Sequence, residues 1–222
     1  LPLFNNATQA QKAPGSTFKP IIAVAALEEG VIGLNDTVNC TGIYKEISPA
    51  LRCWIYPGQH GPLDVVHGIQ NSCNVFFSEM GHRLSMDENG NYSPEFGIEK
   101  IRKYASLFGL DETSGIEIAE REPQMTTEKP EASSIGQGKN SYSNVQLSRY
   151  ITAVANKGTV FKLSLLDKMT DSQENLLEDF TPEVRSVIDV KDSTWNAVHT
   201  GMRRVISDGS ARKIFSDLEV DI

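Results

Sequence analysis

The sequence predicts a mixed α+β fold, with helices in most of the chain and short strands between them. Two segments indicate helices: residues 21–27 are too uniformly apolar for a surface helix, and residues 98–108 have the periodicity of an amphipathic one. A third segment, residues 36–60, indicates paired short strands or an ordered loop because it is rich in Thr, Tyr, Trp and Pro. The 222 residues are enough for one large domain or two small ones.

Local signals predict the elements in order. Proline is tolerated in the first turn of a helix, so Pro20 fits the start of a buried helix of about four turns, which runs to Glu29 and ends at Gly30. Pro62 is interpreted in the same way, as the first turn of a short helix over 62–70. Four further helices are predicted, over residues 74–84, 98–108, 145–156 and 195–205. The rest of the chain is predicted to be irregular: an extended segment over 1–12, a turn over 86–91, an acidic loop over 113–130 and a variable-looking region over 163–187.

Charge and composition exclude several classes of function. A net charge of −8 and an isoelectric point near 5.1 argue against a surface that binds nucleic acid or anionic membranes. No stretch approaches the roughly 20 apolar residues of a membrane span, and the first four residues lack the basic region of a signal peptide. The chain begins and ends abruptly, with a strand predicted to start at residues 218–222, so we expect a fragment of a longer protein.

The most informative segment is Pro14-Gly15-Ser16-Thr17-Phe18-Lys19-Pro20. It predicts a serine at the start of a helix and a lysine three residues later on the same face. A serine hydroxyl needs an adjacent base to become a nucleophile, and a desolvated lysine can supply one. The helix N-terminus favours an oxyanion through its dipole and its free N–H groups. Ser16 and Lys19 are therefore a candidate acyl-transfer pair.

A second motif, Ser72-Cys73-Asn74, is predicted to lie on a bend between two helices. A hydroxyl and a carboxamide two residues apart can face one cleft, where the hydroxyl relays a proton and the amide holds a substrate peptide group. The alternative is that Ser72 or Asn74 only caps the helix that follows, which is the commonest role of such residues.

Together the two motifs resemble the transpeptidase domain of class B penicillin-binding proteins. Further matches follow in the family's order: Ser-Ile-Gly-Gln-Gly at 134–138, Val-Gln-Leu at 145–147, Ala-Asn-Lys-Gly-Thr-Val at 155–160, Ala-Val-His-Thr-Gly-Met at 197–202 and Ser-Asp-Gly at 207–209. The resemblance covers nearly the whole chain. It implies the α+β fold that this family shares with serine β-lactamases, an all-helical lobe against an α/β lobe. Residues 1–222 would be a partial transpeptidase domain with a helical lobe over about 16–156 and an incomplete central antiparallel sheet.

The resemblance also implies a reaction and its participants. Ser16 would be acylated by the D-Ala-D-Ala end of a peptidoglycan stem peptide, with Lys19 as its base and with Ser72 and Asn74 in the roles given above. β-lactam antibiotics would acylate the same serine, and no cofactor would be required for catalysis. The parent protein would cross-link peptidoglycan outside the cytoplasm, held to the membrane by an N-terminal anchor absent here, beside other cell-wall synthesis proteins.

Two departures from the family pattern are visible. Ser143-Asn144 stands where a Thr-Pro pair is usual, which alters only a helix start. The family's Lys-Thr-Gly motif on a sheet strand is absent from the 222 residues, and Lys157-Gly158-Thr159 has the wrong order. That strand would supply one oxyanion-hole N–H, and losing one such donor costs about 10²–10³ in rate. We therefore expect the chain as given to be impaired or inactive.

Two other classes of function remain open. Class D-like β-lactamases and β-lactam sensors also use Ser-Thr-Phe-Lys at the nucleophile, although they usually have a hydrophobic residue in the position of Asn74. Fast deacylation would indicate a β-lactamase and slow deacylation a sensor. The non-enzymatic alternative is a degenerate domain that serves as a scaffold for cell-wall proteins.

Three cysteines and one histidine within residues 40–73 raise the question of a metal. Cys40, Cys53, His60 and Cys73 offer three thiolates and an imidazole, a suitable tetrahedral set for structural zinc. Such a site would clamp the loop over 40–60 to the wall of the active site. The alternative is a Cys40–Cys53 disulfide across two strands, with Cys73 buried and free.

Overall fold

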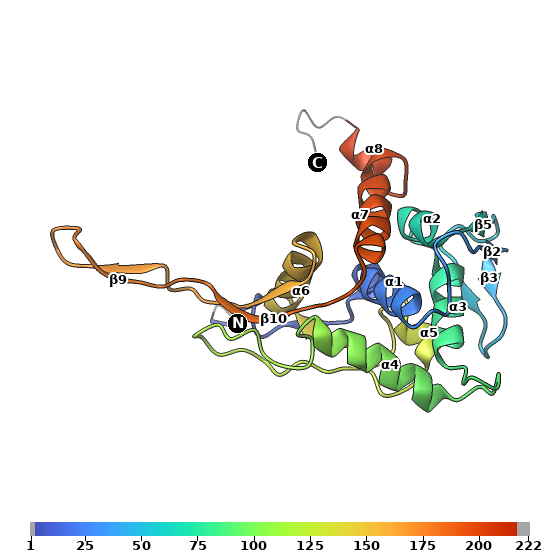
Figure 1. Ribbon diagram of the computed structural model, residues 1–222, viewed down its shortest axis with the longest axis horizontal. Coiled ribbons are helices and arrows are strands. Elements are labelled where there is room, and N and C mark those ends of the chain that lie inside the picture. Colours follow the sequence, from blue (N-terminus) through green and yellow to red (C-terminus); the bar gives the residue numbers. More distant parts are fainter. Residues whose placement is uncertain (1–2, 217–222) are drawn as a thin grey trace. The chain divides into compact units, whose positions relative to one another are not determined.

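The computed structural model describes residues 3–216 (Figure 1). These residues divide into two compact units. Unit 1 comprises residues 3–12, 105–125 and 141–189, and unit 2 comprises residues 13–104, 126–140 and 190–216. The strand predicted to begin at 218 lies outside the described residues. The prediction of a mixed α+β fold with antiparallel sheets is confirmed.

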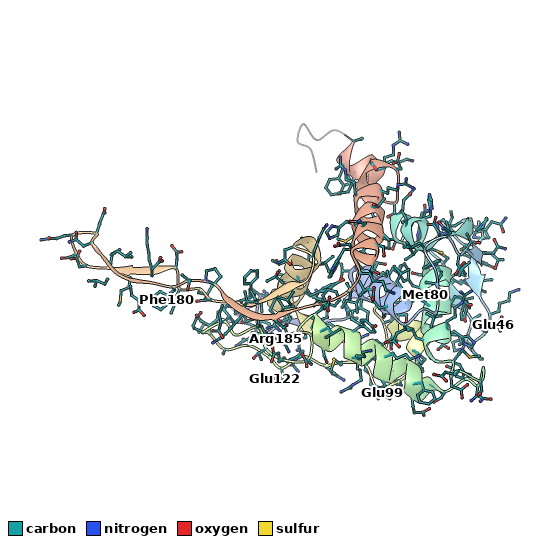
Figure 2. The ribbon with its side chains drawn as sticks, in the orientation of Figure 1. Glu46, Met80, Glu99, Glu122, Phe180 and Arg185 are labelled. Atoms are coloured by element: carbon teal, nitrogen blue, oxygen red, sulfur yellow. The ribbon has the colours of Figure 1, made fainter. Side chains whose placement is uncertain are left out.

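Unit 2 is built mainly of helices around α1 (Lys19–Glu28), which packs against α2 (Val65–Gln70), α3 (Asn74–Leu84) and α7 (Asp192–Ser207). Short antiparallel pairs join β2 (Val38–Cys40) to β5 (Gly61–Leu63) and β3 (Ile43–Tyr44) to β4 (Leu51–Arg52). The remaining elements of unit 2 are η1 (Gly15–Phe18), α4 (Pro94–Leu107, whose last turn belongs to unit 1), α5 (Pro130–Ser133) and α8 (Arg212–Phe215). Met80 on α3 is fully buried among these helices (Figure 2).

The nucleophile segment forms the start of α1 as its sequence predicts. Residues 15–18 make a single 3-10 turn, and Pro20 occupies the first α-helical turn, where its missing N–H costs no hydrogen bond. Every residue from Lys19 to Leu27 is buried, which confirms a helix inside the core. Gly30 ends the segment at φ +68°, a conformation that favours glycine.

The helix predicted over 62–70 is wrong in its first part. Pro62 lies in β5 opposite Asn39, and α2 begins only at Val65. Asp64 is the reason for the later start, because its carboxylate accepts a hydrogen bond from the His67 backbone N–H at 2.8 Å and caps the helix. Proline fits the first turn of a helix and also a short edge strand, so its presence alone could not decide between the two.

Unit 1 contains α6 (Asn144–Ala155) and three antiparallel strand pairs. The pairs join β1 (Gln11–Lys12) to β6 (Tyr142–Ser143), β7 (Thr159–Lys162) to β10 (Glu183–Val187), and β8 (Lys168–Thr170) to β9 (Leu176–Asp179). The last three strands fall in the region that the sequence leaves as variable. They are short and mostly exposed, so they lack the alternation of apolar and polar residues that would predict a strand.

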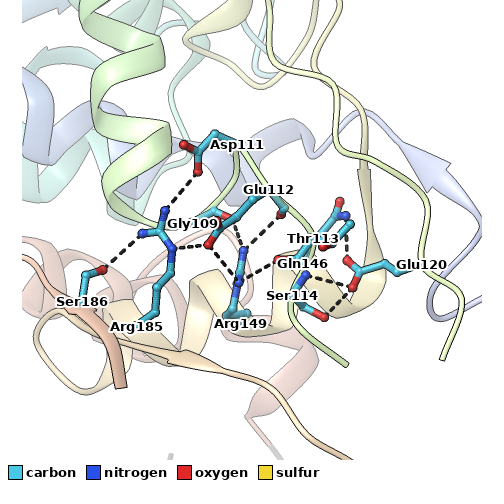
Figure 3. Close-up of polar contacts among 10 residues, drawn as sticks. All are labelled: Gly109, Asp111, Glu112, Thr113, Ser114, Glu120, Gln146, Arg149, Arg185 and Ser186. Carbon is cyan, nitrogen blue, oxygen red and sulfur yellow. Dashed lines mark hydrogen bonds and ion pairs between the residues drawn. The ribbon is translucent and has the colours of Figure 1, made fainter. Parts of the chain in front are cut away.

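In unit 1, a buried arginine on α6 binds the backbone of the turn that follows α4 (Figure 3). Arg149 on α6 is 2 % exposed, and its guanidinium donates to the carbonyls of Gly109, Glu112 and Thr113, the last at 3.0 Å. Arg185 of β10 binds the Glu112 carboxylate from the other side. One arginine thereby satisfies three backbone acceptors of the turn that follows α4, among them the carbonyl of the buried Gly109.

Across residues 3–216, no helix is both long and apolar enough to span a membrane.

Candidate active site

The Ser16 hydroxyl stands on η1, and the turn that carries it is held by backbone contacts. The Gly15 N–H donates to the carbonyl of Gly136 at 3.0 Å, and Thr17 Oγ1 donates to the carbonyl of Pro14 at 2.8 Å. Gly136 has φ +72°, and a Cβ at this position would collide with the Gly15 carbonyl. The Gly-Gln-Gly segment is therefore part of the support for the nucleophile turn.

A continuous hydrogen-bonded chain joins the four residues that the sequence predicts. Ser72 Oγ donates to Ser16 Oγ at 2.9 Å, and the Lys19 ammonium donates to Ser72 Oγ at 3.0 Å. The same ammonium donates to the Ser72 carbonyl at 2.7 Å and to Asn74 Oδ1 at 2.9 Å. The structure thus brings all four side chains together, with one difference in detail: Lys19 reaches the Ser16 hydroxyl through Ser72.

Burial changes the acidity of Lys19. Its side chain is 2 % exposed, and this desolvation lowers its pKa from 10.5 to about 8. Negative charge on the nearby Cys73 and Cys53 sulfurs acts in the opposite direction and raises the pKa, but by less. A lysine with a pKa of about 8 is partly neutral near pH 7, so it can accept a proton, whereas an ordinary surface lysine is almost fully protonated there. The location in the core of unit 2 is therefore what suits Lys19 to act as a base.

We expect the acylation of Ser16 to depend on pH through Lys19. With a pKa of about 8, about a tenth of the amines are neutral at pH 7 and about half at pH 8. If the neutral amine is the base, the acylation rate rises nearly tenfold per pH unit below pH 7 and levels off above about pH 8. Stopped-time mass measurements of penicillin adducts between pH 5.5 and 9.5 test this, and a rate that stays flat or falls with rising pH would contradict it.

Neither Ser72 nor Asn74 caps α3. The cap residue is Cys73, whose sulfur accepts from the Phe76 N–H at 3.4 Å, so the capping role predicted as an alternative for Ser72 or Asn74 is wrong. Ser72 has φ +47°, a left-handed conformation that costs a non-glycine residue about 1–2 kcal/mol. The strained backbone turns the Ser72 hydroxyl away from the helix and toward Ser16.

Two contacts bind residues 71–74 to the preceding loop, and neither has a signal in the sequence. Asn74 Nδ2 donates to the Arg52 carbonyl at 3.2 Å, so both ends of the Asn74 amide are held. The Trp54 indole N–H donates to the Asn71 carbonyl at 2.8 Å. Asn74 is therefore preorganised between the loop and Lys19.

The four predicted metal-ligating residues also lie close together, and one of them, Cys73, directly follows Ser72 in the chain. Cys40 Sγ lies 3.5 Å and Cys53 Sγ 3.7 Å from His60 Nδ1, and the Cys53 and Cys73 sulfurs are 3.9 Å apart. All four ligand atoms lie within 4.8 Å of one another. Tetrahedral zinc with bonds of about 2.3 Å to sulfur and about 2.0 Å to nitrogen requires separations of about 3.5–3.8 Å. The three close pairs match these separations, and the wider pairs, at up to 4.8 Å, would draw together around a zinc ion.

The three thiols are free, and there is no Cys40–Cys53 disulfide. The hydrogen bond between Cys53 and Cys73 lowers the pKa of the Cys53 thiol to about 4 and raises the pKa of Cys73, so the pair shares one proton. The lowered pKa of Cys53 favours the thiolate form that a metal ligand takes, whereas Cys73 would lose its proton only when a metal binds. The cluster could hold a metal ion.

His67 belongs to the structural framework. Its Nδ1 lies 2.8 Å from the Asp64 carboxylate that caps α2, and its Nε2 lies 3.0 Å from Arg204 of α7. These contacts fasten α2 to α7.

Comparison with known proteins places the chain in a family. Residues 2–220 match the family model described as "Penicillin binding protein transpeptidase domain". The chain belongs to the penicillin-binding protein transpeptidase family. The chain is 28 % identical over 229 residues to the "Peptidoglycan D,D-transpeptidase MrdA" of Haemophilus influenzae and 29 % identical over 234 residues to the protein of the same name from Escherichia coli strain K12. Both alignments cover 97 % of this chain.

Solved structures of the transpeptidase family have the same fold. A chain in the structure described as "Structural coordination of polymerization and crosslinking by a peptidoglycan synthase complex" is 25 % identical, with a TM-score of 0.82 over 99 % of this chain and 37 % of that one. The chain spans about a third of the length of the curated relatives it matches. It is thus homologous to serine D,D-transpeptidases over nearly all of its own length.

Proposed function

We propose that this chain carries the nucleophile of a peptidoglycan D,D-transpeptidase and that Ser16 forms an acyl-enzyme with the D-Ala-D-Ala end of a stem peptide. The observation that carries the proposal is the chain of hydrogen bonds from Ser16 through Ser72 to a buried Lys19 with a lowered pKa. β-lactams would acylate the same hydroxyl. Family membership supports the substrate class, because the curated relatives are named peptidoglycan D,D-transpeptidases.

The hydrogen bonds suggest the path of the proton. When Lys19 is neutral, the Ser16 hydroxyl can donate to Ser72 Oγ while the Ser72 hydroxyl donates to Lys19 Nζ. As Ser16 Oγ forms a bond to the carbonyl carbon, its proton passes to Ser72, and the Ser72 proton passes to Lys19, which becomes an ammonium. The reverse transfer delivers a proton to the leaving nitrogen, the C–N bond breaks, and D-alanine departs. Asn74 would hold the substrate's peptide group through its fixed amide.

Intact mass after incubation with benzylpenicillin tests this function. We expect an adduct of one penicillin that forms slowly, if at all, on the chain as given and faster on a longer form with a Lys-Thr-Gly strand. The matching Ser16→Ala chains should form none, because only the nucleophile differs. A Ser210→Ala chain is the matched control, since Ser210 precedes a lysine by three residues on an exposed turn. An adduct that survives in Ser16→Ala, or no adduct even in a longer form with a Lys-Thr-Gly strand, would refute the proposal.

The lifetime of the adduct separates the alternatives. Persistence over hours supports a transpeptidase or a sensor, whereas loss within seconds indicates a β-lactamase. The slow acylation expected of the 222 residues without a Lys-Thr-Gly strand stays a prediction, which the comparison with the longer form tests. The proposal also includes an extracytoplasmic location and cell-wall synthesis partners for the whole protein, since peptidoglycan is polymerised there.

We further propose that Cys40, Cys53, His60 and Cys73 hold a structural zinc ion. The four converging ligand atoms, three of them on buried thiols, support this assignment. The ion would have no part in acyl transfer. These residues would instead tie the Arg52–Trp54 segment to the wall of the site, because Cys73 directly follows Ser72 and Cys53 directly follows Arg52.

Removal of the metal tests the zinc site. The purified chain should contain about one zinc per molecule, its three thiols should react with a thiol reagent only after a chelator is added, and the chelator should lower its unfolding temperature by several degrees. A Ser78→Cys chain, which adds a buried thiol on α3 that is not one of the four candidate ligands, serves as the control for burial alone. Two thiols released only by a reductant would show a disulfide and end the zinc assignment.

A further inference from the structure

The exposed surface beside Asn74 carries a cation that the proposed acyl transfer does not use. Arg52 is exposed at the end of β4, and its guanidinium carbon lies 4.8 Å from the centre of the Tyr56 ring. Among the ion pairs of residues 3–216, none includes Arg52. An arginine stacked on an aromatic ring has a fixed orientation while the N–H groups at its edge remain available to a ligand.

Arg52 is joined to the candidate active site through its backbone. Its carbonyl accepts from Asn74 Nδ2 at 3.2 Å, and Asn74 Oδ1 in turn accepts from Lys19 at 2.9 Å. Asn74, whose amide is proposed to hold a substrate peptide group, is hydrogen-bonded both to the Arg52 carbonyl and to Lys19. A peptide bound along Asn74 would therefore pass close to the residue that carries this guanidinium.

The backbone beneath Arg52 is well fixed. The Cys53 N–H donates to the Gly42 carbonyl at 2.9 Å, and the Cys53 side chain is 2 % exposed. Two residues on, the Trp54 indole binds the Asn71 carbonyl. A fixed backbone places the Cα and Cβ atoms of Arg52 in a defined position, which a side chain needs if it is to bind a ligand specifically.

The chemistry of an unpaired guanidinium selects its ligand. The planar fork of N–H donors matches a carboxylate and can bind it through two parallel hydrogen bonds. The chain as a whole carries a net charge of −8, so it has no general attraction for anions. An acidic group would be drawn to this place by the local contact.

We propose that Arg52, held against Tyr56, binds a carboxylate side group of the acyl-donor peptide, on the part that precedes its D-Ala-D-Ala end. The inference rests on the proposed function, because it takes that peptide as the ligand of the Ser16 site. Arg52 would be a specificity-determining residue, which distinguishes donors with a free carboxylate from donors in which that group is a carboxamide.

Two synthetic donors that differ only in this group test the inference. Both end in D-Ala-D-Ala, and one has a carboxylate where the other has a carboxamide. Their non-covalent dissociation constants are measured on a Ser16→Ala chain by NMR titration. We expect the carboxylate donor to bind about tenfold more tightly, in line with a hydrogen bond to a charged group. An added Arg52→Gln should bring the ratio to about one, and Arg52→Lys should leave an intermediate value.

Matched variants separate recognition from general effects of charge. Arg203→Gln removes an exposed arginine on α7 and should keep the tenfold ratio. Tyr56→Ala should reduce the ratio, and Tyr56→Phe should keep it, because only the ring is needed for stacking. Equal affinity for the two donors with Arg52 intact would overturn the inference without any variant, and so would a ratio unchanged by Arg52→Gln.

The penicillin adduct distinguishes the two proposals. If Ser16 forms no adduct even in the longer form with a Lys-Thr-Gly strand but the ratio of affinities depends on Arg52, acyl transfer is refuted and the carboxylate site stands. If the adduct forms and the ratio is one, acyl transfer stands and the carboxylate site is refuted.

Discussion

A Lys19→Met chain is expected to be acylated by penicillin about 10²–10⁴-fold more slowly than the unmodified chain, which is the range that a general base contributes. Lys19 Nζ contacts Ser72 Oγ, the Ser72 carbonyl and Asn74 Oδ1, so Lys19→Met removes the amine that would accept the proton at the end of the Ser16–Ser72 chain. Methionine has a similar length and suits a site that is 2 % exposed. The adduct formed per minute, measured by intact mass at pH 8, gives the rate.

The control for Lys19→Met is Lys103→Met, which removes an exposed ammonium that pairs with Glu29. It should leave the rate unchanged. Thermal unfolding of both variants shows whether the fold is kept. A folded Lys19→Met chain that reacts within threefold of the unmodified rate would exclude Lys19 as the base.

A Gly136→Ala chain is expected to lose at least about 10²-fold in the rate of acylation, because a misplacement of about 1 Å has this cost. Gly136 has φ +72°, and a methyl group there would collide with the Gly15 carbonyl, one residue before the nucleophile. The turn can accept the methyl group only if the Gly15–Gly136 hydrogen bond of 3.0 Å breaks and Ser16 moves. The same mass assay measures the effect.

Gly138→Ala is the matched control, since Gly138 also has φ +72° and carries the same backbone strain. Its added Cβ would lie 3.1 Å from Ser133 Oγ, a side-chain atom that can move, and no backbone atom of the nucleophile turn is nearby. Gly138→Ala should therefore lower stability without a comparable loss of rate. Equal losses in the two variants would mean that strain, and not the position of Ser16, is responsible.

Much of the helical part of this fold could be predicted from the sequence, because the apolar spacing and the end residues that indicate a helix lie only a few residues apart. The spacing of Val75, Phe76, Met80 and Leu84 predicts α3 with the bounds that the structure has. The pairing of β2 with β5 could not be predicted in the same way, since it joins residues more than twenty positions apart. Pro62 was misplaced for this reason: its strand partner Asn39 leaves no local signal.

The candidate site shows the same division. Helix geometry is sufficient to place Lys19 on the face that carries Ser16. It cannot say that the ammonium binds Ser72 and Asn74, because those contacts arise from the packing of α1 against α3. The support from Gly136 and the contact of Arg52 with Asn74 are likewise tertiary, and they depend on backbone carbonyls, which every residue has.

The left-handed backbone of Ser72 has a consequence for engineering this chain. A serine at φ +47° gives up stability that a glycine would keep, so a search for stabilising substitutions would select Ser72→Gly. That substitution deletes the hydroxyl that joins Ser16 to Lys19. Thermal robustness and chemical competence therefore make opposite demands on one residue, and a library screened only for heat resistance would enrich inert proteins.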